Sequence, residues 1–328
     1  MLFEKIGFAP SEEGKYIASI DFGSHTARFL LGQTCAPPEF FRHVVRKRVY
    51  TNLAEGFPRD GAGVINEKAM ERAVHAITHF TSIAHGYPIS YIAGAATGIM
   101  RRAENGLELL ERIKERTGVD INVIKGEDEA ALTLMGISHA LKLNGSPDAF
   151  FDLGGATTEI IIYSRGHKKV YSFPLGAFVL TEQYLKHDPP LEEEINKLKL
   201  YVDSIILDNV SSLKKTGADI LLIGSGGTVT SLMALALDID EEEVSPDRIN
   251  GAILEMDMVK SIYSMVRPMS ITERLRIKGI DEGRAAVILS GVIAVMSIME
   301  FFNSDSLTVS YSDILEGLII SHLKGAKR

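Results

Sequence analysis

The chain has 328 residues, of which 45% are hydrophobic and 24% charged, and its formal net charge is −8 at pH 7. This length predicts two domains of about 150 residues each, with the composition of an ordinary globular protein. The acidic balance argues against broad nonspecific binding to nucleic acid, which depends on an excess of lysine and arginine, and the single cysteine, Cys35, excludes a disulfide framework.

The amino-terminal half is typical of alternating strands and helices. Residues 1–15 carry acids where a signal peptide would have a basic and then an apolar run, so we expect a cytoplasmic protein. We expect strands over 16–21, 29–33 and 41–50, a helix capped by Asn66, a strand over 89–97, a helix from about Glu104, a strand ending at Gly126 and a helix over 127–143. This alternation predicts an α/β fold.

One of these strands is unusually basic. In "RHVVRKR", residues 42–48, strand alternation places Arg42, Arg46 and Arg48 on one face, where they could guide a polyanion. A charged edge strand that resists pairing with other chains explains the same residues equally well.

The second half becomes increasingly helical. We expect strands over 168–174 and 219–224, helices near Thr181 and Leu191, and a last helix over about 312–323 that packs back on the first domain. The apolar stretch 285–299 is shorter than the roughly 18 to 20 residues that cross a bilayer, so it predicts a buried core helix and no membrane partner.

A strand, an acidic residue, a small polar turn and a second strand occur twice, in "SIDFGSHTARFLL" (19–31) and "FFDLGGATTEIII" (150–162). The alignment pairs Asp21 with Asp152, Gly23 with Gly154, Ser24 with Gly155, Thr26 with Thr157 and Arg28 with Glu159. Such a repeat predicts two similarly built domains, residues 1–127 and 128–311, that face each other across a cleft.

Three turns of similar composition follow apolar strands, and each suits phosphate oxygens. Glycines let backbone N–H groups approach an anion, and hydroxyl groups add further donors. The candidate phosphate-binding residues are Gly23, Ser24, His25, Thr26, Gly154, Gly155, Ala156, Thr157, Gly226, Gly227 and Thr228. The P-loop and the dinucleotide-binding fingerprint are both missing from these stretches.

Acidic residues accompany these turns. Asp21 and Asp152 could hold Mg²⁺ beside phosphate, or they could only accept hydrogen bonds from loop amides. Glu127, Asp128 and Glu129 stand at a strand-to-helix junction, where acids usually interact with the helix dipole. A carboxylate at that junction could instead orient and deprotonate a water molecule.

Together these stretches resemble the exopolyphosphatase and guanosine pentaphosphate phosphohydrolase (Ppx/GppA) family. "IDFGSHTARFLL" looks like the family's opening motif, and "FFDLGGATTE" is similar to its second glycine-rich motif. Five further stretches look like later motifs of the family and occur in the same order along the chain: "ATGIMRRAENG", "IKGEDEA", "FPLGAFVLTE", "IGSGGT" and "EGRAAVILSG". The resemblance implies two actin-like, ribonuclease H-like domains of the acetate and sugar kinase, Hsp70 and actin superfold, with an interdomain cleft.

The resemblance also implies an activity, the removal of terminal phosphate from inorganic polyphosphate, from guanosine pentaphosphate or from both. Glu129 would activate water and Arg101 would contact phosphate. Asp152 and Glu159 would organise Mg²⁺ and water. The chain looks like the short, two-domain form of the family, whose members are often homodimers.

Several positions depart from the family pattern. His25 replaces an asparagine, Ala156 replaces a glycine, and Ile99 replaces a residue with a hydroxyl group. Asn52 stands where an arginine is common. The stretch "SYSDILEG" (310–317) lacks the acid, the glycine and the arginine that usually precede its Glu-Gly pair. These departures keep a second hypothesis open, a regulator that binds guanosine alarmones without turnover. A sugar or acetate kinase is disfavoured, because no sugar-binding signature is evident.

Overall fold

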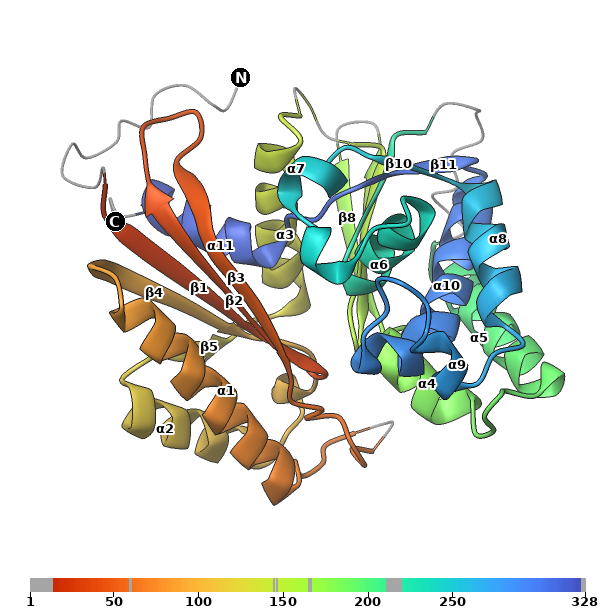
Figure 1. Cartoon of the computed structure of the whole chain (residues 1–328), viewed down its shortest axis with the longest axis horizontal. Coiled ribbons are helices and arrows are strands. Elements are labelled where there is room, and N and C mark those ends of the chain that lie inside the picture. Colours follow the sequence, from red (N-terminus) through yellow and green to blue (C-terminus); the bar gives the residue numbers. More distant parts are fainter. Residues whose placement is uncertain are drawn as a thin grey trace. The chain divides into compact units, whose positions relative to one another are not determined.

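A computed structural model describes residues 14–58, 61–143, 145, 147–164, 167–210 and 220–325. The stretch in which we expect no signal peptide lies almost entirely outside these residues. The chain divides into two compact units (Figure 1). Unit 1 joins Met1–His139 to Asp313–Arg328, and unit 2 is Ala140–Ser312. The helix over 126–140, which we expected to open the second domain, thus belongs almost entirely to unit 1.

Unit 1 is built on a five-stranded sheet of order β3-β2-β1-β4-β5, in which β1 pairs with β2 in antiparallel and with β4 in parallel orientation. Its strands are β1 (Tyr16–Phe22), β2 (Thr26–Thr34), β3 (Phe41–Tyr50), β4 (Ile89–Ala96) and β5 (Ile121–Val123). Its helices are α1 (Glu67–His85), the 3-10 helix η1 (Gly98–Arg101), α2 (Gly106–Thr117), α3 (Gly126–Ala140) and α11 (Ile314–Gly325). The cap predicted for α1 is confirmed, because the Asn66 side chain accepts a hydrogen bond from Ala69 N.

Helices cover both faces of this sheet. α1 packs on α2 and on β2, and α11 contacts β1, β2 and β4 (Figure 1). Ile17 and Leu30 pack with Leu315, Ile319 and Ile320 of α11 in one buried cluster. The central strand β1 is buried along almost its whole length, as expected for a strand covered on both faces.

α11 and α3 approach each other through two glycines. A Cβ atom on Gly317 would collide with the carbonyl oxygen of Leu132, and one on Gly136 would collide with that of Asp313. The obstacles are backbone atoms, which cannot rotate away. The close packing of the carboxyl-terminal helix on unit 1 therefore requires glycine at both positions.

We expect Gly317→Ala to lower the melting temperature of the protein by roughly 2–8 °C, measured by circular dichroism, because a net cost of about 1–2 kcal/mol shifts the midpoint of a unit of this size by roughly 2–4 °C per kcal/mol. Alanine favours a helix by up to about 1 kcal/mol over glycine, but overpacking against a backbone carbonyl typically costs about 1–3 kcal/mol. Gly325→Ala in the same helix is the matched control, because nothing lies within 4 Å of the added Cβ atom. Equal melting temperatures for the two variants would contradict this account.

Unit 2 contains a six-stranded sheet of order β10-β11-β9-β6-β7-β8. Its strands are β6 (Ala149–Leu153), β7 (Thr158–Ser164), β8 (His167–Phe173), β9 (Leu222–Ser225), β10 (Ile253–Glu255) and β11 (Ser306–Val309). Its helices are α4 (Ala177–Tyr184), α5 (Glu192–Val210), α6 (Gly227–Ala236), η3 (Glu241–Glu243), α7 (Pro246–Ile249), α8 (Met256–Val266), α9 (Ile271–Arg274) and α10 (Glu282–Phe302).

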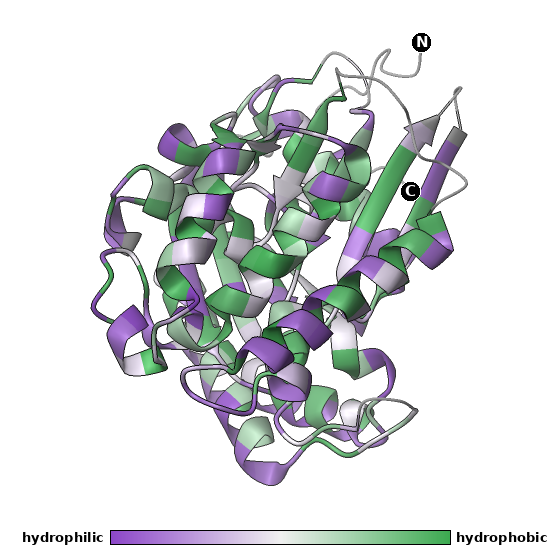
Figure 2. Ribbon diagram, turned by 90° about the vertical axis from the view of Figure 1, so that its right-hand side faces the viewer, coloured by the Kyte–Doolittle hydropathy of each residue, from purple (hydrophilic) through white to green (hydrophobic). Residues whose placement is uncertain are grey.

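The core of unit 2 is organised around α10, which packs against α4, α5, α6 and α8. Sixteen of its residues are buried, so the prediction of a buried core helix is confirmed. The helix extends beyond the apolar stretch seen in the sequence, and its 21 residues are long and apolar enough to cross a membrane by length and composition alone. The core helix of a soluble protein passes the same test. The ribbon coloured by hydropathy shows hydrophobic and hydrophilic residues alternating along helices of the fold (Figure 2).

The two sheets repeat one topology. In unit 1, β1 joins the antiparallel strands β2 and β3 to the parallel strands β4 and β5. In unit 2, β6 likewise joins the antiparallel strands β7 and β8 to the parallel strands β9 and β11. The internal repeat predicted from the sequence is therefore confirmed at the level of the sheets.

The predicted basic face of β3 is wrong in one position. Arg48 and Arg46 lie opposite Arg28 and Leu30, but a β-bulge between Leu31 and Gly32 shifts the register. Arg42 therefore lies opposite Gln33, on the other face of the sheet. β3 is an edge strand of its sheet.

Candidate functional site

The first glycine-rich turn joins β1 to β2 in unit 1. Gly23 N donates to Thr26 O at 2.9 Å, which closes the turn. The buried Ser24 side chain accepts a hydrogen bond from Ile99 N at 2.9 Å, so the turn is fastened to η1. Gly98, whose φ is +59°, allows this contact, since a Cβ atom there would collide with Ser24 Oγ. The turn and the helix that carries Arg101 are thus positioned together.

Neighbouring residues complete this turn. His25 is buried and its ring packs edge-on against Tyr50, while its carbonyl oxygen accepts hydrogen bonds from Thr51 N and Asn52 N. Asn52 has a positive φ of 48°, a conformation that asparagine tolerates better than most residues. His25 and Asn52, two of the positions that depart from the family pattern, are therefore in direct contact with each other.

Arg101 and Glu129 form an ion pair in unit 1. Arg101 Nη1 donates to Glu129 Oε2 at 2.6 Å and to Ile124 O at 3.3 Å. Glu129 lies in the first turn of α3, and its side chain is 12% exposed. The other two acids of the cluster, Glu127 and Asp128, are exposed. The structure thus distinguishes Glu129 from its neighbours by burial and by its partner.

The electrostatic environment makes Glu129 a stronger base than a free glutamate. Burial raises its pKa above the usual value, while the Arg101 guanidinium acts in the opposite direction and the charge of Asp21 raises the pKa further. A carboxylate with a raised pKa accepts a proton more readily near neutral pH. The pKa effect also indicates that Asp21 lies within electrostatic range of Glu129.

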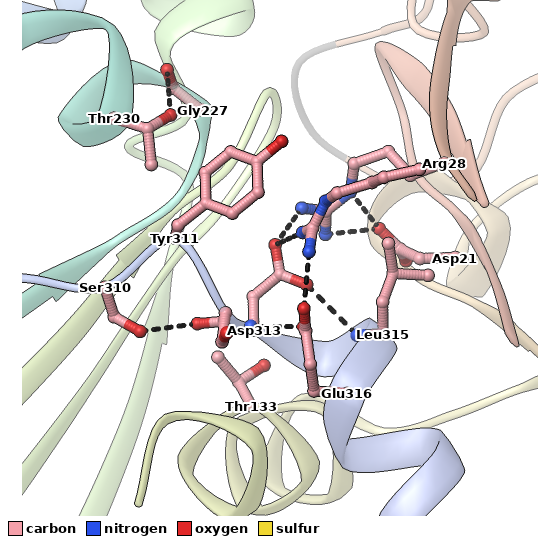
Figure 3. Close-up of polar contacts among 12 residues, drawn as sticks. Asp21, Arg28, Thr133, Gly227, Thr230, Ser310, Tyr311, Asp313, Leu315 and Glu316 are labelled. Carbon is pink, nitrogen blue, oxygen red and sulfur yellow. Dashed lines mark hydrogen bonds and ion pairs between the residues drawn. The ribbon is translucent and has the colours of Figure 1, made fainter. Parts of the chain in front are cut away.

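Asp21 stands at the end of β1, directly opposite Arg28 of β2. Arg28 Nε and Nη2 donate to Asp21 Oδ2 at 2.8 and 2.6 Å (Figure 3). Burial raises the pKa of Asp21, and Arg28 offsets only part of this effect. The other carboxylate oxygen, Asp21 Oδ1, is buried and has no hydrogen-bond partner among the described residues. An ion or a water molecule could satisfy this oxygen.

Unit 2 carries a second hairpin of the same design. Gly154 N donates to Thr157 O at 3.0 Å, and Asp152 lies opposite Glu159 as Asp21 lies opposite Arg28. Because directly opposed residues share a face of the sheet, the carboxylates of Asp152 and Glu159 project on the same side. Glu159 accepts a hydrogen bond from Ser172 Oγ at 2.7 Å.

The carbonyl groups of this turn support α4. Gly154 O and Gly155 O accept hydrogen bonds from Ala177 N and Phe178 N, which lie in the first turn of that helix. Ala156 is buried beside Gly176, where a Cβ atom would collide with the backbone of Ala156. The loop is therefore held rigidly at the helix end.

The third glycine-rich turn joins β9 to α6. Gly226 has a φ of +97°, and a Cβ atom there would lie 2.8 Å from Asp152 Oδ1. Gly227, at the first position of α6, packs against the Arg284 guanidinium of α10. Thr228 is buried, and its side chain packs against Gly291 of α10. The second and third glycine-rich turns of the chain, which both belong to unit 2, therefore meet at Asp152.

The structure thus gathers the predicted site residues into two groups, one in each unit. Unit 1 brings together Asp21, Gly23, Ser24, His25, Thr26, Arg101 and Glu129; unit 2 brings together Asp152, Gly154, Gly155, Ala156, Thr157, Glu159, Gly226, Gly227 and Thr228. That both groups face one substrate stays a prediction. Within the described parts of the chain there is no group of three or more His, Cys, Asp or Glu side chains that could hold a metal ion.

Sequence reasoning missed the partners of the basic strand. Arg46 donates to Glu316 and Asp313 of the α11 region, and Arg28 also donates to Asp313. Both acids are buried. Their only signal in the sequence was the departure of "SYSDILEG" from the family pattern.

Solved structures share this fold over almost the whole chain. A Ppx/GppA family member from Aquifex aeolicus aligns with a TM-score of 0.77 and 26% identity, covering 96% of this chain and 99% of that one. An exopolyphosphatase from Cytophaga hutchinsonii aligns with a TM-score of 0.83 over 95% of this chain and 98% of its own, and its 23% identity shows the fold alone. The fold of this chain is thus that of a Ppx/GppA protein, an α/β structure with two similar sheets.

Sequence comparison gives the family. Residues 36–326 match the model of the Ppx/GppA phosphatase family, so the chain belongs to this family. Exopolyphosphatase 2 of Mycobacterium tuberculosis is 28% identical over 93% of this chain and 98% of its own. Guanosine-5'-triphosphate,3'-diphosphate pyrophosphatase of Vibrio atlanticus is 28% identical over 92% of this chain, which spans 58% of that protein.

Proposed function

We propose that this chain hydrolyses the terminal phosphate of inorganic polyphosphate or of guanosine pentaphosphate. The observation that carries the proposal is the largely buried Glu129 carboxylate paired with Arg101 beside the Asp21 turn, in a member of a phosphatase family. The names of the relatives in Mycobacterium tuberculosis and Vibrio atlanticus support these two substrate classes.

In the proposed reaction, Glu129 orients a water molecule toward the terminal phosphorus atom. Its Oε1 or Oε2 accepts the proton as the new O–P bond forms and the anhydride O–P bond breaks, releasing orthophosphate and the shortened chain. Arg101 holds the carboxylate in place and supplies positive charge beside it. Phosphoryl transfer through a loose transition state depends mainly on such positioning and charge stabilisation.

A magnesium ion fits the residues present. Mg²⁺ usually binds through one or two carboxylates, with water and substrate phosphates as its other ligands. Within unit 1 the buried Asp21 Oδ1 suits that role, and within unit 2 the carboxylates of Asp152 and Glu159, which lie opposite each other, suit it as well. The ion would neutralise phosphate charge when bound.

The direct test is orthophosphate release by the purified chain from polyphosphate and from guanosine pentaphosphate, each with magnesium. Release from either substrate supports the proposal, and the ratio of kcat/KM values identifies the preferred one. Tight binding of guanosine pentaphosphate without release from either substrate would indicate the regulator instead.

We expect removal of divalent cations by EDTA to lower phosphate release at least tenfold, because several phosphate charges would remain uncompensated. Adding back excess Mg²⁺ should restore the rate. Asp152→Asn should raise the magnesium concentration needed for half-maximal activity, whereas Asp120→Asn, at an exposed aspartate of unit 1, should not. A rate that is unaffected by EDTA would contradict the role assigned to the metal.

A further inference from the structure

Two acids at the start of α11 bind two arginines of the unit 1 sheet. Asp313 Oδ2 accepts a hydrogen bond from Arg28 Nη1 (Figure 3). The same oxygen accepts a second hydrogen bond from Arg46 Nη2 at 3.1 Å. Arg46 Nη1 donates to Glu316 Oε1. Asp313 Oδ1 accepts from Leu315 N at 3.0 Å, so both carboxylate oxygens of Asp313 are engaged. The whole group belongs to unit 1.

Arg28 connects this group to the candidate site. It donates to Asp21 on one side and to Asp313 on the other, and its charge lowers the pKa of Glu129. A guanidinium within electrostatic range of the proposed base is well placed to contact a substrate phosphate. In this structure the N–H groups of Arg28 donate to the carboxylates of Asp21 and Asp313.

The charges around the site are closely balanced. Arg28, Arg46 and Arg101 face the four carboxylates of Asp21, Glu129, Asp313 and Glu316. Burial alone would raise the pKa of Asp313, but Arg28 and Arg46 outweigh burial and hold the pKa below its usual value. Asp313 therefore remains a carboxylate at neutral pH, with only 2% of its surface exposed.

A phosphate chain that binds to Arg28 and Arg46 has to displace this carboxylate. Carboxylate and phosphate oxygens match the same planar fork of N–H donors, so the two anions compete for it. Asp313 is covalently fixed at the site and already desolvated, which gives it an advantage over a solvated anion.

We propose that Asp313 is an internal anion that competes with substrate phosphate for Arg28 and Arg46 and so weakens binding of the phosphate chain. The inference rests on the proposed function, which makes the ligand a phosphoanhydride. It assigns to Asp313 a role in setting substrate affinity, with no part in the proton transfer at Glu129.

The test is the binding of inorganic tripolyphosphate, measured by isothermal titration calorimetry on the full chain carrying Glu129→Gln to slow turnover. Asp313→Asn keeps the shape and the hydrogen-bonding ability of the side chain and removes its charge. We expect it to lower the Kd for tripolyphosphate about tenfold or more, the scale of one charge-assisted hydrogen bond. Asp313→Ser also retains an acceptor for Leu315 N and replaces the asparagine variant if the latter does not fold.

Asp120→Asn is the matched control, since it makes the same chemical change at an exposed carboxylate that pairs with Lys114 in the same unit. Its Kd should stay within about twofold of the parent value, because exposed ion pairs contribute little. Equal or weaker binding by the Asp313 variants, with normal binding by the parent, would overturn this inference alone. If no variant binds tripolyphosphate and the parent without Glu129→Gln releases no phosphate, both this inference and the proposed function are wrong.

Discussion

Glu129→Gln is expected to lower kcat for phosphate release by about 10² to 10⁴, the usual contribution of a general base. Glutamine keeps the size of the side chain and its ability to accept a hydrogen bond from Arg101, but it cannot accept the proton of the attacking water. The KM for polyphosphate should change little, because Glu129 contacts the water and not the phosphate chain. Initial rates of orthophosphate release across substrate concentrations separate the two effects.

The matched control is Glu127→Gln, an identical change two residues earlier in the first turn of α3. Glu127 is exposed, whereas Glu129 is largely buried against Arg101. We expect Glu127→Gln to retain the parent rate within about twofold, since a surface carboxylate interacts weakly with its surroundings. A Glu129→Gln variant with the parent kcat would exclude Glu129 as the base.

Arg101→Met is expected to lower kcat/KM by about 10 to 10³ at neutral pH and to move the acid limb of the pH–rate profile to higher pH. Glu129 must be deprotonated to act as a base, and its pKa is already raised by burial. Arg101 opposes that rise. Its removal therefore raises the pKa further, so the active carboxylate form appears only at higher pH. The deficit should be largest at low pH and should shrink as the pH increases.

Two comparisons sharpen this prediction. Arg101→Lys keeps the charge and should leave the acid limb closer to that of the parent, although the geometry of the pair is lost. Arg102→Met removes the neighbouring guanidinium, which lies over the Phe57 ring instead of against Glu129, and should leave the limb in place. If Arg101→Met loses activity with no shift of the limb, Arg101 does not set the pKa of Glu129.

Much of the fold could be predicted from local patterns. The apolar runs that end in Asp21 and Asp152 form the first strands of two sheets, and the small polar turns that follow have the same closing hydrogen bond. Glycine content, strand alternation and the Asn66 cap are properties of short segments, so the sequence displays them directly.

The errors and omissions concern contacts between distant segments. The bulge in the pairing of β2 with β3 depends on the partner strand, and strict alternation therefore misplaced Arg42. Asp313 and Arg28 are 285 residues apart in the chain, and no local pattern connects them. The need for glycine at position 317 is equally hidden, because it arises from the backbone of α3, a helix far away in the sequence.

The return of α11 to unit 1 also has a consequence for biosynthesis. Ile17 and Leu30 emerge early from the ribosome, yet the helix that shields them is encoded almost three hundred codons later. Nascent chains that end before Asp313 would display an uncovered apolar sheet, and Arg28 and Arg46 would lack the carboxylates of Asp313 and Glu316. Such intermediates are the kind that molecular chaperones bind, so unit 2 should complete its folding during translation before unit 1 does.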